Sequence, residues 1–123
     1  MLFTLLLNII NIAIGRTAKA NRSIREMITV RNCAYVIKTK DGKIGRRFIF
    51  RKGKYSSDRV LDDFDLALVF DNAAIGFKAL ALDGATGMTK AMNNFEMKLV
   101  GNQHIYSFIG VIIGVSMGML KRP

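Results

Sequence analysis

The sequence predicts an α+β fold, and two patterns and one turn signal carry that prediction. From Thr29 the pattern has a period of two, with Val30, Ala34 and Val36 on one face and, further on, Phe48 and Phe50 on one face, which is the period of half-buried strands. Asp41-Gly42 interrupts this stretch with a typical hairpin turn. Two longer apolar segments, 2–14 and 105–120, have the length of helices instead. We expect a single domain of 123 residues.

The N-terminal segment, 1–28, is expected to be helical, either as one long helix or as two with the bend at Gly15. Apolar residues occupy most of the circumference of its first part, which requires burial on more than one side, or contact with lipid or with another copy of the chain. Residues 2–14 are short for a membrane span of about 20 residues, and no positive stretch precedes them as in a signal peptide. The rest of the chain, 29–123, is expected to hold the sheet and its covering helices.

The formal charge is +10, and residues 1–59 carry fourteen of the nineteen Lys and Arg residues against only three acids. Such an asymmetry favours an anionic partner, such as a phosphate backbone, an acidic lipid headgroup or the phosphates of a CoA-type molecule. Some of these cations follow each other at steps of three, which predicts one helical ridge. A solvated face is the alternative to membrane contact through Arg16, Lys19, Arg22 and Arg25.

Five strands are expected in the rest of the chain. Strands at 30–39 and 44–52 should pair antiparallel across the hairpin turn, and a short polar strand at 54–59 should lie at the edge of the sheet. The fourth strand, 64–70, should place alternate apolar residues on one face. The fifth should turn Phe95, Met97 and Leu99 inward.

Three helices should accompany the last two strands. Asp71 or Asn72 is expected to cap a helix that begins at Ala73 and ends at Gly84. Thr86 is a candidate cap for a short helix, and a final apolar helix should run over 103–120. Gly110, Gly114 and Gly118 give this last helix a repeated small-residue spacing, which predicts a close approach to a sheet or to a ligand.

The residues give little support for catalysis. His104 and Cys33 are the only residues of their types and lie far apart in sequence, so we expect no Cys-His site. Asp62, Asp63 and Asp65 would alternate in direction along a strand, which favours a solvated strand entrance over a metal site. We therefore expect no enzyme, no metal and no cofactor. A lone cysteine also favours a reducing, cytoplasmic setting, and His104 is expected beside the mouth of a cavity.

One stretch resembles the sterol carrier protein type 2 family: D-L-A-L-V-F, followed by A-L-A-L-D-G-A-T-G-M-T-K-A-M-N-N-F-E-M-K-L-V-G-N. The likeness covers about residues 62–118. The matching positions are Gly84, Ala91, Lys98, Leu99, Gly101 and Asn102. Met88, Met92 and Phe95 stand instead where the family has proline, an aromatic residue and glycine.

The resemblance implies a five-stranded, mainly antiparallel sheet covered on one face by helices and enclosing an apolar tunnel. It also implies non-enzymatic binding, and possible transfer, of a fatty acyl chain, sterol, isoprenoid, acyl-CoA or phospholipid. Some bacterial relatives assist ubiquinone biosynthesis. Seven methionines and no tryptophan suit a flexible apolar ligand. The expected lining is Phe48, Phe50, Leu66, Leu68, Phe70, Phe77, Met88, Met92, Met97, Leu99, Phe108 and Ile112.

Two further interpretations remain. Residues 84–87 read Gly-Ala-Thr-Gly, formally the G-x-x-G loop of an RNA-binding module, but this loop carries no basic residue, so nucleic acid is an unlikely partner. A membrane-associated accessory protein, held at an anionic bilayer or joined to a second copy through its N-terminal helix, is compatible with lipid binding.

Overall fold

The computed structural model describes residues 2–82 and 87–121. Its elements, in chain order, are α1 (Leu2–Ala20), α2 (Arg22–Thr29), β1 (Cys33–Thr39), β2 (Gly45–Arg51), β3 (Lys54–Asp58), β4 (Leu66–Phe70), α3 (Ala73–Phe77), the π-helical turn η1 (Lys78–Leu82), α4 (Gly87–Asn93), β5 (Met97–Gly101), the 3-10 turn η3 (Gln103–Ile105) and α5 (Tyr106–Lys121).

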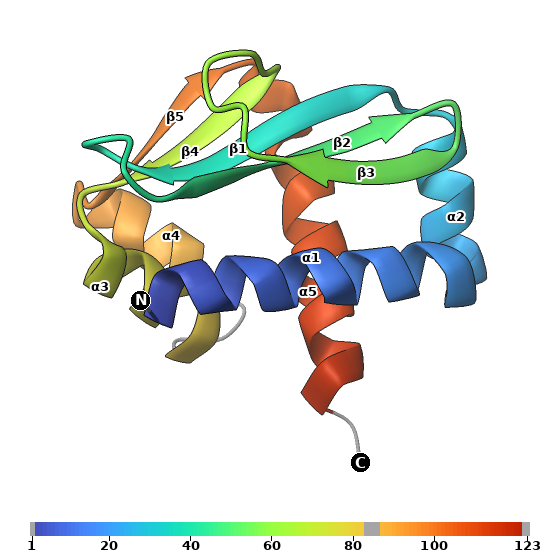
Figure 1. Cartoon of the computed structure of the whole chain (residues 1–123), viewed down its shortest axis with the longest axis horizontal. Helices are drawn as coiled ribbons and strands as arrows, with labels where there is room; N and C mark the ends of the chain where they lie inside the picture. Colours follow the sequence, from blue (N-terminus) through green and yellow to red (C-terminus); the bar gives the residue numbers. More distant parts are fainter. Residues whose placement is uncertain (1, 83–86, 122–123) are drawn as a thin grey trace.

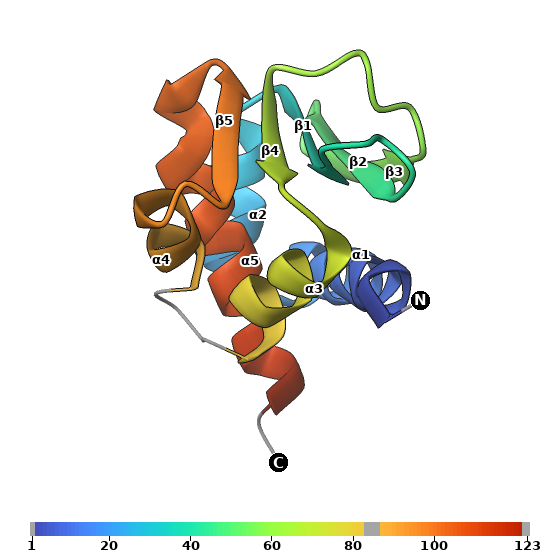
Figure 2. The same cartoon turned by 90° about the vertical axis from the view of Figure 1, so that its left-hand side faces the viewer.

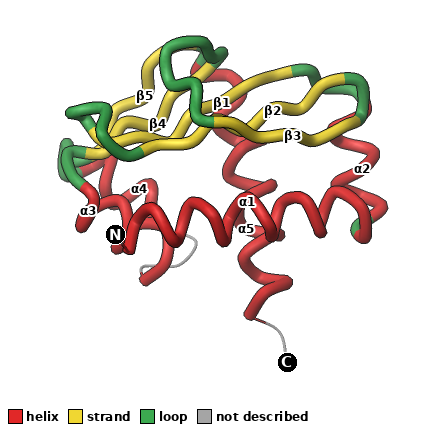
Figure 3. Tube along the Cα trace, viewed as in Figure 1, coloured by secondary structure: helices red, strands yellow, loops and turns green. Residues whose placement is uncertain are grey.

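The strands form one five-stranded sheet in the order β3-β2-β1-β4-β5. β1 and β4 are parallel, and the other neighbouring pairs are antiparallel. The predicted meander of three strands, with the polar strand at the edge, is confirmed. The helices lie on one side of the sheet (Figures 1 and 3), so the predicted α+β architecture is confirmed as well.

The connection from β3 to β4 crosses the sheet on the side away from the helices (Figure 1). Arg47 holds it in place: its Nε and Nη2 donate to Asp58 at 2.8 and 2.6 Å, and its Nη1 donates to Asp63 at 3.3 Å. The same loop carries Phe64, whose ring centroid lies 5.4 Å from the Lys38 ammonium nitrogen. The prediction that Phe64 begins the fourth strand is therefore wrong, since β4 begins at Leu66.

The core lies between the sheet and the helices. Alternate residues of the three inner strands, β2, β1 and β4, share this core with α1 and α5, as the period-two pattern predicts. Aromatic rings join the layers: Tyr35 stacks on Phe48 with centroids 5.0 Å apart, and Phe50 meets Phe108 of α5 edge-on at 5.6 Å. The sheet and α5 are consequently in direct contact at this point.

The N-terminal helix differs from the prediction. α1 continues through Gly15 and ends at Ala20, because Ile14 and Ala18 on either side are buried and hold the helix on the core. The break comes at Asn21, whose Oδ1 accepts a hydrogen bond from Ile24 N at 3.1 Å and so caps α2. The predicted bend at Gly15 was thus placed about six residues too early.

The second half of the chain follows the prediction more closely. Asn72 is the cap of α3, with its Oδ1 accepting from Ile75 N at 2.9 Å. Phe95 is an exception: it is 85% exposed and has a φ of 59°. It ends α4 in the left-handed conformation that normally favours glycine, and Glu96 N closes that turn on Ala91 O at 2.8 Å. The predicted helix end at Gly84 and the predicted cap at Thr86 lie outside the described residues.

Within the described residues, α1 is the one helix with the length and apolar composition of a membrane span, and it lies near the N-terminus. Its inner side is buried against the sheet and α5, with Phe3 meeting Phe70 edge-on at 6.0 Å. A helix of a soluble core meets the same criteria. Its outer side exposes four large apolar residues: Leu2, Leu5, Ile9 and Ile12.

Candidate functional site

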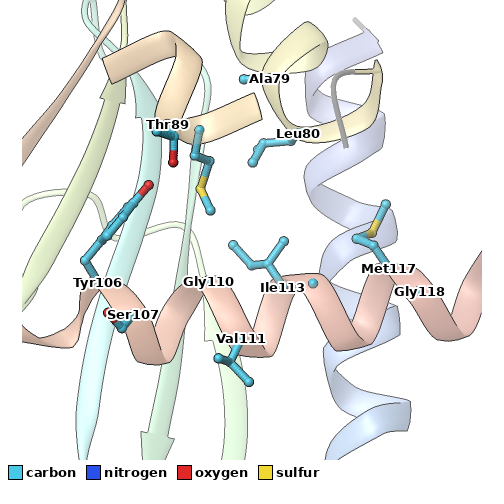
Figure 4. Close-up of a pocket in the computed structure, with 12 residues that line it drawn as sticks. Ala79, Leu80, Thr89, Tyr106, Ser107, Gly110, Val111, Ile113, Met117 and Gly118 are labelled. Atoms are coloured by element: carbon cyan, nitrogen blue, oxygen red, sulfur yellow. The ribbon is translucent and has the colours of Figure 1, made fainter. Parts of the chain in front are cut away.

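A cleft of about 480 Å³ lies between α5 on one side and η1 with α4 on the other (Figure 4). We call it the neutral cleft, since no charged residue borders it among those described. Its volume is within the range typical of small-molecule sites. It is lined by Ala79, Leu80, Met88, Thr89, Tyr106, Ser107, Gly110, Val111, Ile113, Gly114, Met117 and Gly118.

Glycines form the α5 side of the neutral cleft. Gly110, Gly114 and Gly118 recur every four residues and therefore share one face of the helix. A Cβ added to any of them would meet no atom within 4 Å outside its own helix backbone. The predicted close approach to the sheet is therefore absent at these three positions, and the stripe instead leaves room in the cleft.

The opposite wall depends on another glycine. A Cβ on Gly87, the first residue of α4, would collide with the backbone carbonyl of Ala79. Only glycine lets α4 approach η1 this closely, which brings Met88 and Thr89 of α4 beside Ala79 and Leu80 of η1 along the cleft. This spacing sets the position of the wall that faces α5.

The polar atoms of the cleft are at one end. The hydroxyls of Thr89 and Tyr106 point toward each other from α4 and α5, while Ile113 and Met117 lie further along the helix (Figure 4). Burial raises the pKa of Tyr106, and the Thr89 hydroxyl partly offsets this effect. Tyr106 therefore keeps its proton at neutral pH and can donate a hydrogen bond.

Of the twelve predicted lining residues, all of which the structure describes, only Met88 borders the neutral cleft. Phe77, Met88, Met92 and Leu99 are half-buried and pack against the core. The remaining eight are buried within the core itself: Phe48, Phe50, Leu66, Leu68, Phe70, Met97, Phe108 and Ile112. A tunnel between the sheet and the helices remains a prediction.

The N-terminal helix explains why these residues are packed. The inner side of α1 carries large side chains such as Phe3, Leu7 and Ile10, each at most 2% exposed. They fill space beneath the sheet, and α5 adds Phe108 and Ile112. This segment has no counterpart in the motif that suggested the tunnel, so its packing could not be anticipated from the motif. A ligand in this layer would require α1 or α5 to move.

A second cleft, of about 730 Å³, lies where α1, α2 and the hairpin between β2 and β3 meet. We call it the basic cleft, because four cations and no acid border it among the described residues. Its lining is Ile12, Gly15, Arg16, Ala18, Lys19, Arg25, Gly53, Lys54 and Tyr55. The Tyr55 hydroxyl donates to Asn11 Oδ1 at 2.6 Å, which fixes the ring against α1.

The predicted basic ridge is wrong in one respect. The break at Asn21 puts Arg16 and Lys19 on α1 but Arg22 and Arg25 on α2, so the four do not follow one helix. Three of them meet again in the basic cleft, where the Arg25 Nη1 donates to Lys19 O at 3.2 Å. Arg22 instead pairs with Glu26 at 3.2 Å, and Lys54 takes the fourth place.

The aspartates, the cysteine and the histidine that the sequence analysis considered for catalysis or metal binding do not form a reactive site among the described residues. Asp65 accepts a hydrogen bond from Ala34 N at 2.7 Å, and Asp63 pairs with Arg47. Burial, and to a smaller extent Asp65, raises the pKa of Cys33 to about 11, so its thiol is protonated at neutral pH. His104 is exposed in η3. Across residues 2–82 and 87–121, no three His, Cys, Asp or Glu side chains form a candidate metal site.

The architecture, a mixed five-stranded sheet with helices on one face, is that of the sterol carrier protein 2 fold. The chain is similar to a solved structure described as "UbiJ-SCP2 Ubiquinone synthesis protein", with a TM-score of 0.63 and 13% identity over 95% of this chain and 93% of that one. This likeness shows the shared fold.

Two more distant similarities accompany it. One is to a sterol carrier protein 2 like 2 from Aedes aegypti, with a TM-score of 0.41 and 13% identity over 77% of this chain and 95% of that one. The other is to the sec-alkylsulfatase Pisa1 from Pseudomonas sp., with a TM-score of 0.49 and 16% identity over 73% of this chain and 14% of that one. No family model and no curated protein matches the sequence.

Proposed function

We propose that the protein binds a long apolar molecule in the neutral cleft and performs no covalent chemistry on it. The observation that carries this proposal is the glycine stripe of α5, which leaves open space beside an apolar helix instead of packing against a neighbour. Ile113, Met117 and Leu80 then supply apolar contacts, each worth about 25 cal/mol per Å² removed from water. Methionine adds an adaptable surface for a flexible chain.

Purification followed by native mass spectrometry and organic extraction tests this proposal. We expect a co-purifying lipid, and uptake of a pyrene-labelled long-chain probe by protein that has been delipidated. Recovery of no lipid together with no uptake of the probe would rule out the carrier function. The extract also identifies the ligand among acyl chains, sterols, isoprenoids and phospholipids.

A second component of the proposal is peripheral contact with an anionic bilayer. The exposed apolar side of α1 ends at Ile12, which also borders the basic cleft, so an apolar surface and a cationic hollow are continuous. Apolar side chains can enter the acyl boundary while Arg16, Lys19, Arg25 and Lys54 meet phosphates. Flotation with vesicles of phosphatidylglycerol and phosphatidylcholine tests this contact, and loss of binding without phosphatidylglycerol is expected. A second copy seated on α1 would instead appear as a dimer in solution without lipid.

A role beside isoprenoid-quinone synthesis is the more specific candidate. Its support is the name of the solved ubiquinone synthesis protein that shares the fold over nearly the whole chain. Prenylated aromatic compounds in the organic extract would favour this role. An extract that holds only acyl lipids or sterols would count against it and leave the binding function in place.

A further inference from the structure

The neutral cleft has no charged residue along the lining that the structure describes. The protein carries a formal charge of +10, yet the described residues around this cleft offer only three side-chain hydroxyls, on Thr89, Tyr106 and Ser107. All three belong to residues at the Tyr106 end of the cleft, where the Thr89 and Tyr106 hydroxyls face each other and Ser107 lies on the other side of α5, and glycine or apolar residues line the rest (Figure 4). The cleft therefore has a polar end and an apolar trough.

The cations described on η1 and α4 turn elsewhere. Lys78 of η1 and Lys90 of α4 border a different hollow, of about 120 Å³, together with Glu96. His104, which precedes α5 by one turn, is exposed and does not border the neutral cleft. A ligand whose end reaches Thr89 and Tyr106 thus meets hydroxyl groups and no positive charge from the lining that the structure describes.

Hydroxyl groups discriminate between ligand ends. A ligand hydroxyl or carbonyl oxygen can accept a hydrogen bond from Tyr106 or Thr89, and a ligand hydroxyl can also donate to either of them. An ionised carboxylate or phosphate that approached the half-buried Tyr106 hydroxyl would lose part of its hydration without gaining an ion pair from the described lining, which costs more than the same loss costs a neutral group. The charged end would instead stay in water beside the exposed Thr89, away from Tyr106, and leave less of the chain in the trough.

We propose that the neutral cleft selects long apolar molecules whose polar end is an uncharged hydroxyl or carbonyl group, over those that end in a carboxylate or a phosphate. This inference rests on the proposed function, because it assigns the ligand class of the same cleft. It assigns no anion to the neutral cleft, in contrast to the basic cleft.

Competition at pH 8 tests the selectivity. A pyrene-labelled long-chain alcohol is bound to delipidated protein and displaced with 1-tetradecanol or with myristate, both below their solubility limits. We expect 1-tetradecanol to displace the probe at a concentration at least tenfold lower than myristate. Equal or stronger displacement by myristate would overturn the selectivity. Failure of the probe to bind at all would instead overturn the proposed function, so the two failures are distinguishable.

Two variants each remove one hydroxyl, that of Tyr106 or that of Thr89, and keep the shape of the side chain. Tyr106→Phe and Thr89→Val should each weaken 1-tetradecanol about three- to tenfold, as expected for the loss of one hydrogen bond, and leave a hydrocarbon probe unaffected. Equal weakening of the hydrocarbon probe would indicate a change in packing and contradict the assigned role.

Thr89→Lys provides the opposite test. It places an ammonium group at the polar end on an exposed helical position, where lysine is well tolerated. We expect the preference to shift at least tenfold toward myristate. An unchanged preference would show that the ligand end is not at Thr89 and would overturn the proposal. Circular dichroism and the melting temperature confirm that each variant is folded.

Discussion

The two clefts of this small protein are opposite in chemistry. The neutral cleft is bordered by glycines, aliphatic residues and three hydroxyls, whereas the basic cleft is bordered by four cations and one tyrosine. They also differ in origin. The first is formed within the second half of the chain, by η1, α4 and α5, and the second by α1, α2 and the β2-β3 hairpin, all from the first half. The uneven distribution of charge along the sequence therefore gives the folded protein one basic cleft and one neutral cleft.

This difference suggests a division of roles. A surface rich in unpaired cations attracts an anionic partner at a distance, but that attraction is screened by salt. A neutral apolar cleft holds its ligand by burial, which does not depend on ionic strength in the same way. If one cleft takes the ligand and the other meets the membrane, changes at either should leave the other function intact.

The largest expected effect comes from filling the neutral cleft. In Gly114→Leu the new side chain enters the space that the glycine leaves open, so we expect at least a tenfold loss of affinity for the long-chain probe. Vesicle binding should not change. Asn93→Leu is the matched control, since it adds the same side chain on an exposed position of α4 outside the lining. A Gly114→Leu variant that is folded and still binds the probe normally would place the ligand elsewhere.

The second-largest expected effect is that of salt, which should weaken vesicle binding much more than probe binding. Raising ionic strength from about 0.05 to 0.5 M shortens the Debye length roughly threefold. We expect binding to phosphatidylglycerol vesicles to fall about tenfold, while the affinity of the neutral probe changes less than twofold. Flotation and fluorescence titration measure the two quantities on the same protein. A parallel fall in both would mean that one surface serves both functions.

Neutralising single cations sharpens the assignment of the basic cleft. Arg16→Gln and Lys54→Gln should each weaken vesicle binding about fivefold, because one basic residue near an anionic surface contributes about 1 kcal/mol. Arg22→Gln removes the same charge from a residue that pairs with Glu26 outside the cleft, and should have less than a twofold effect. Similar losses in all three variants would show that net charge, and not the cleft, determines binding.

The smallest effect concerns stability. Gly114→Ala adds a methyl group that meets nothing and improves the helix propensity of α5, so the free energy of unfolding should rise by about 0.5 to 1 kcal/mol. Urea denaturation measures this change. By contrast, Gly87→Ala should be destabilising, because its Cβ would collide with the Ala79 backbone. If Gly114→Ala also destabilises, the glycine stripe is packed against something that the open cleft does not account for.

The sequence predicted the strands and most of the helices, because their signals are local. Alternation, the Asp41-Gly42 turn and the Asn72 cap are all decided within a few residues. The predicted bend at Gly15 was wrong, since a helix can continue through a glycine when buried neighbours hold it in place. The prediction for Phe95 was also wrong: periodicity counts it as a strand residue, but it ends α4 with a positive φ.

The site was harder to predict than the fold. The spacing of Gly110, Gly114 and Gly118 was a usable signal for the neutral cleft, although it did not show which element lies opposite. Thr89 and Tyr106 carry no motif, and their hydroxyls face each other only because the tertiary structure places α4 across the cleft from α5. The basic cleft likewise includes Lys54, the first residue of β3, which the sheet places near α1. Figure 2 shows β3 above α1. Such contacts depend on tertiary structure and leave no local pattern.

The most direct test of the account is to locate the bound ligand. A long-chain alcohol that carries a diazirine near the end of its chain can be photo-crosslinked to the protein and mapped by peptide mass spectrometry. We predict labels on the lining of the neutral cleft, around Met88 of α4 and Ile113 to Met117 of α5. Labels on Phe50 or Leu68, on the inner face of the sheet, would instead place the ligand in a tunnel beneath the sheet and contradict the account.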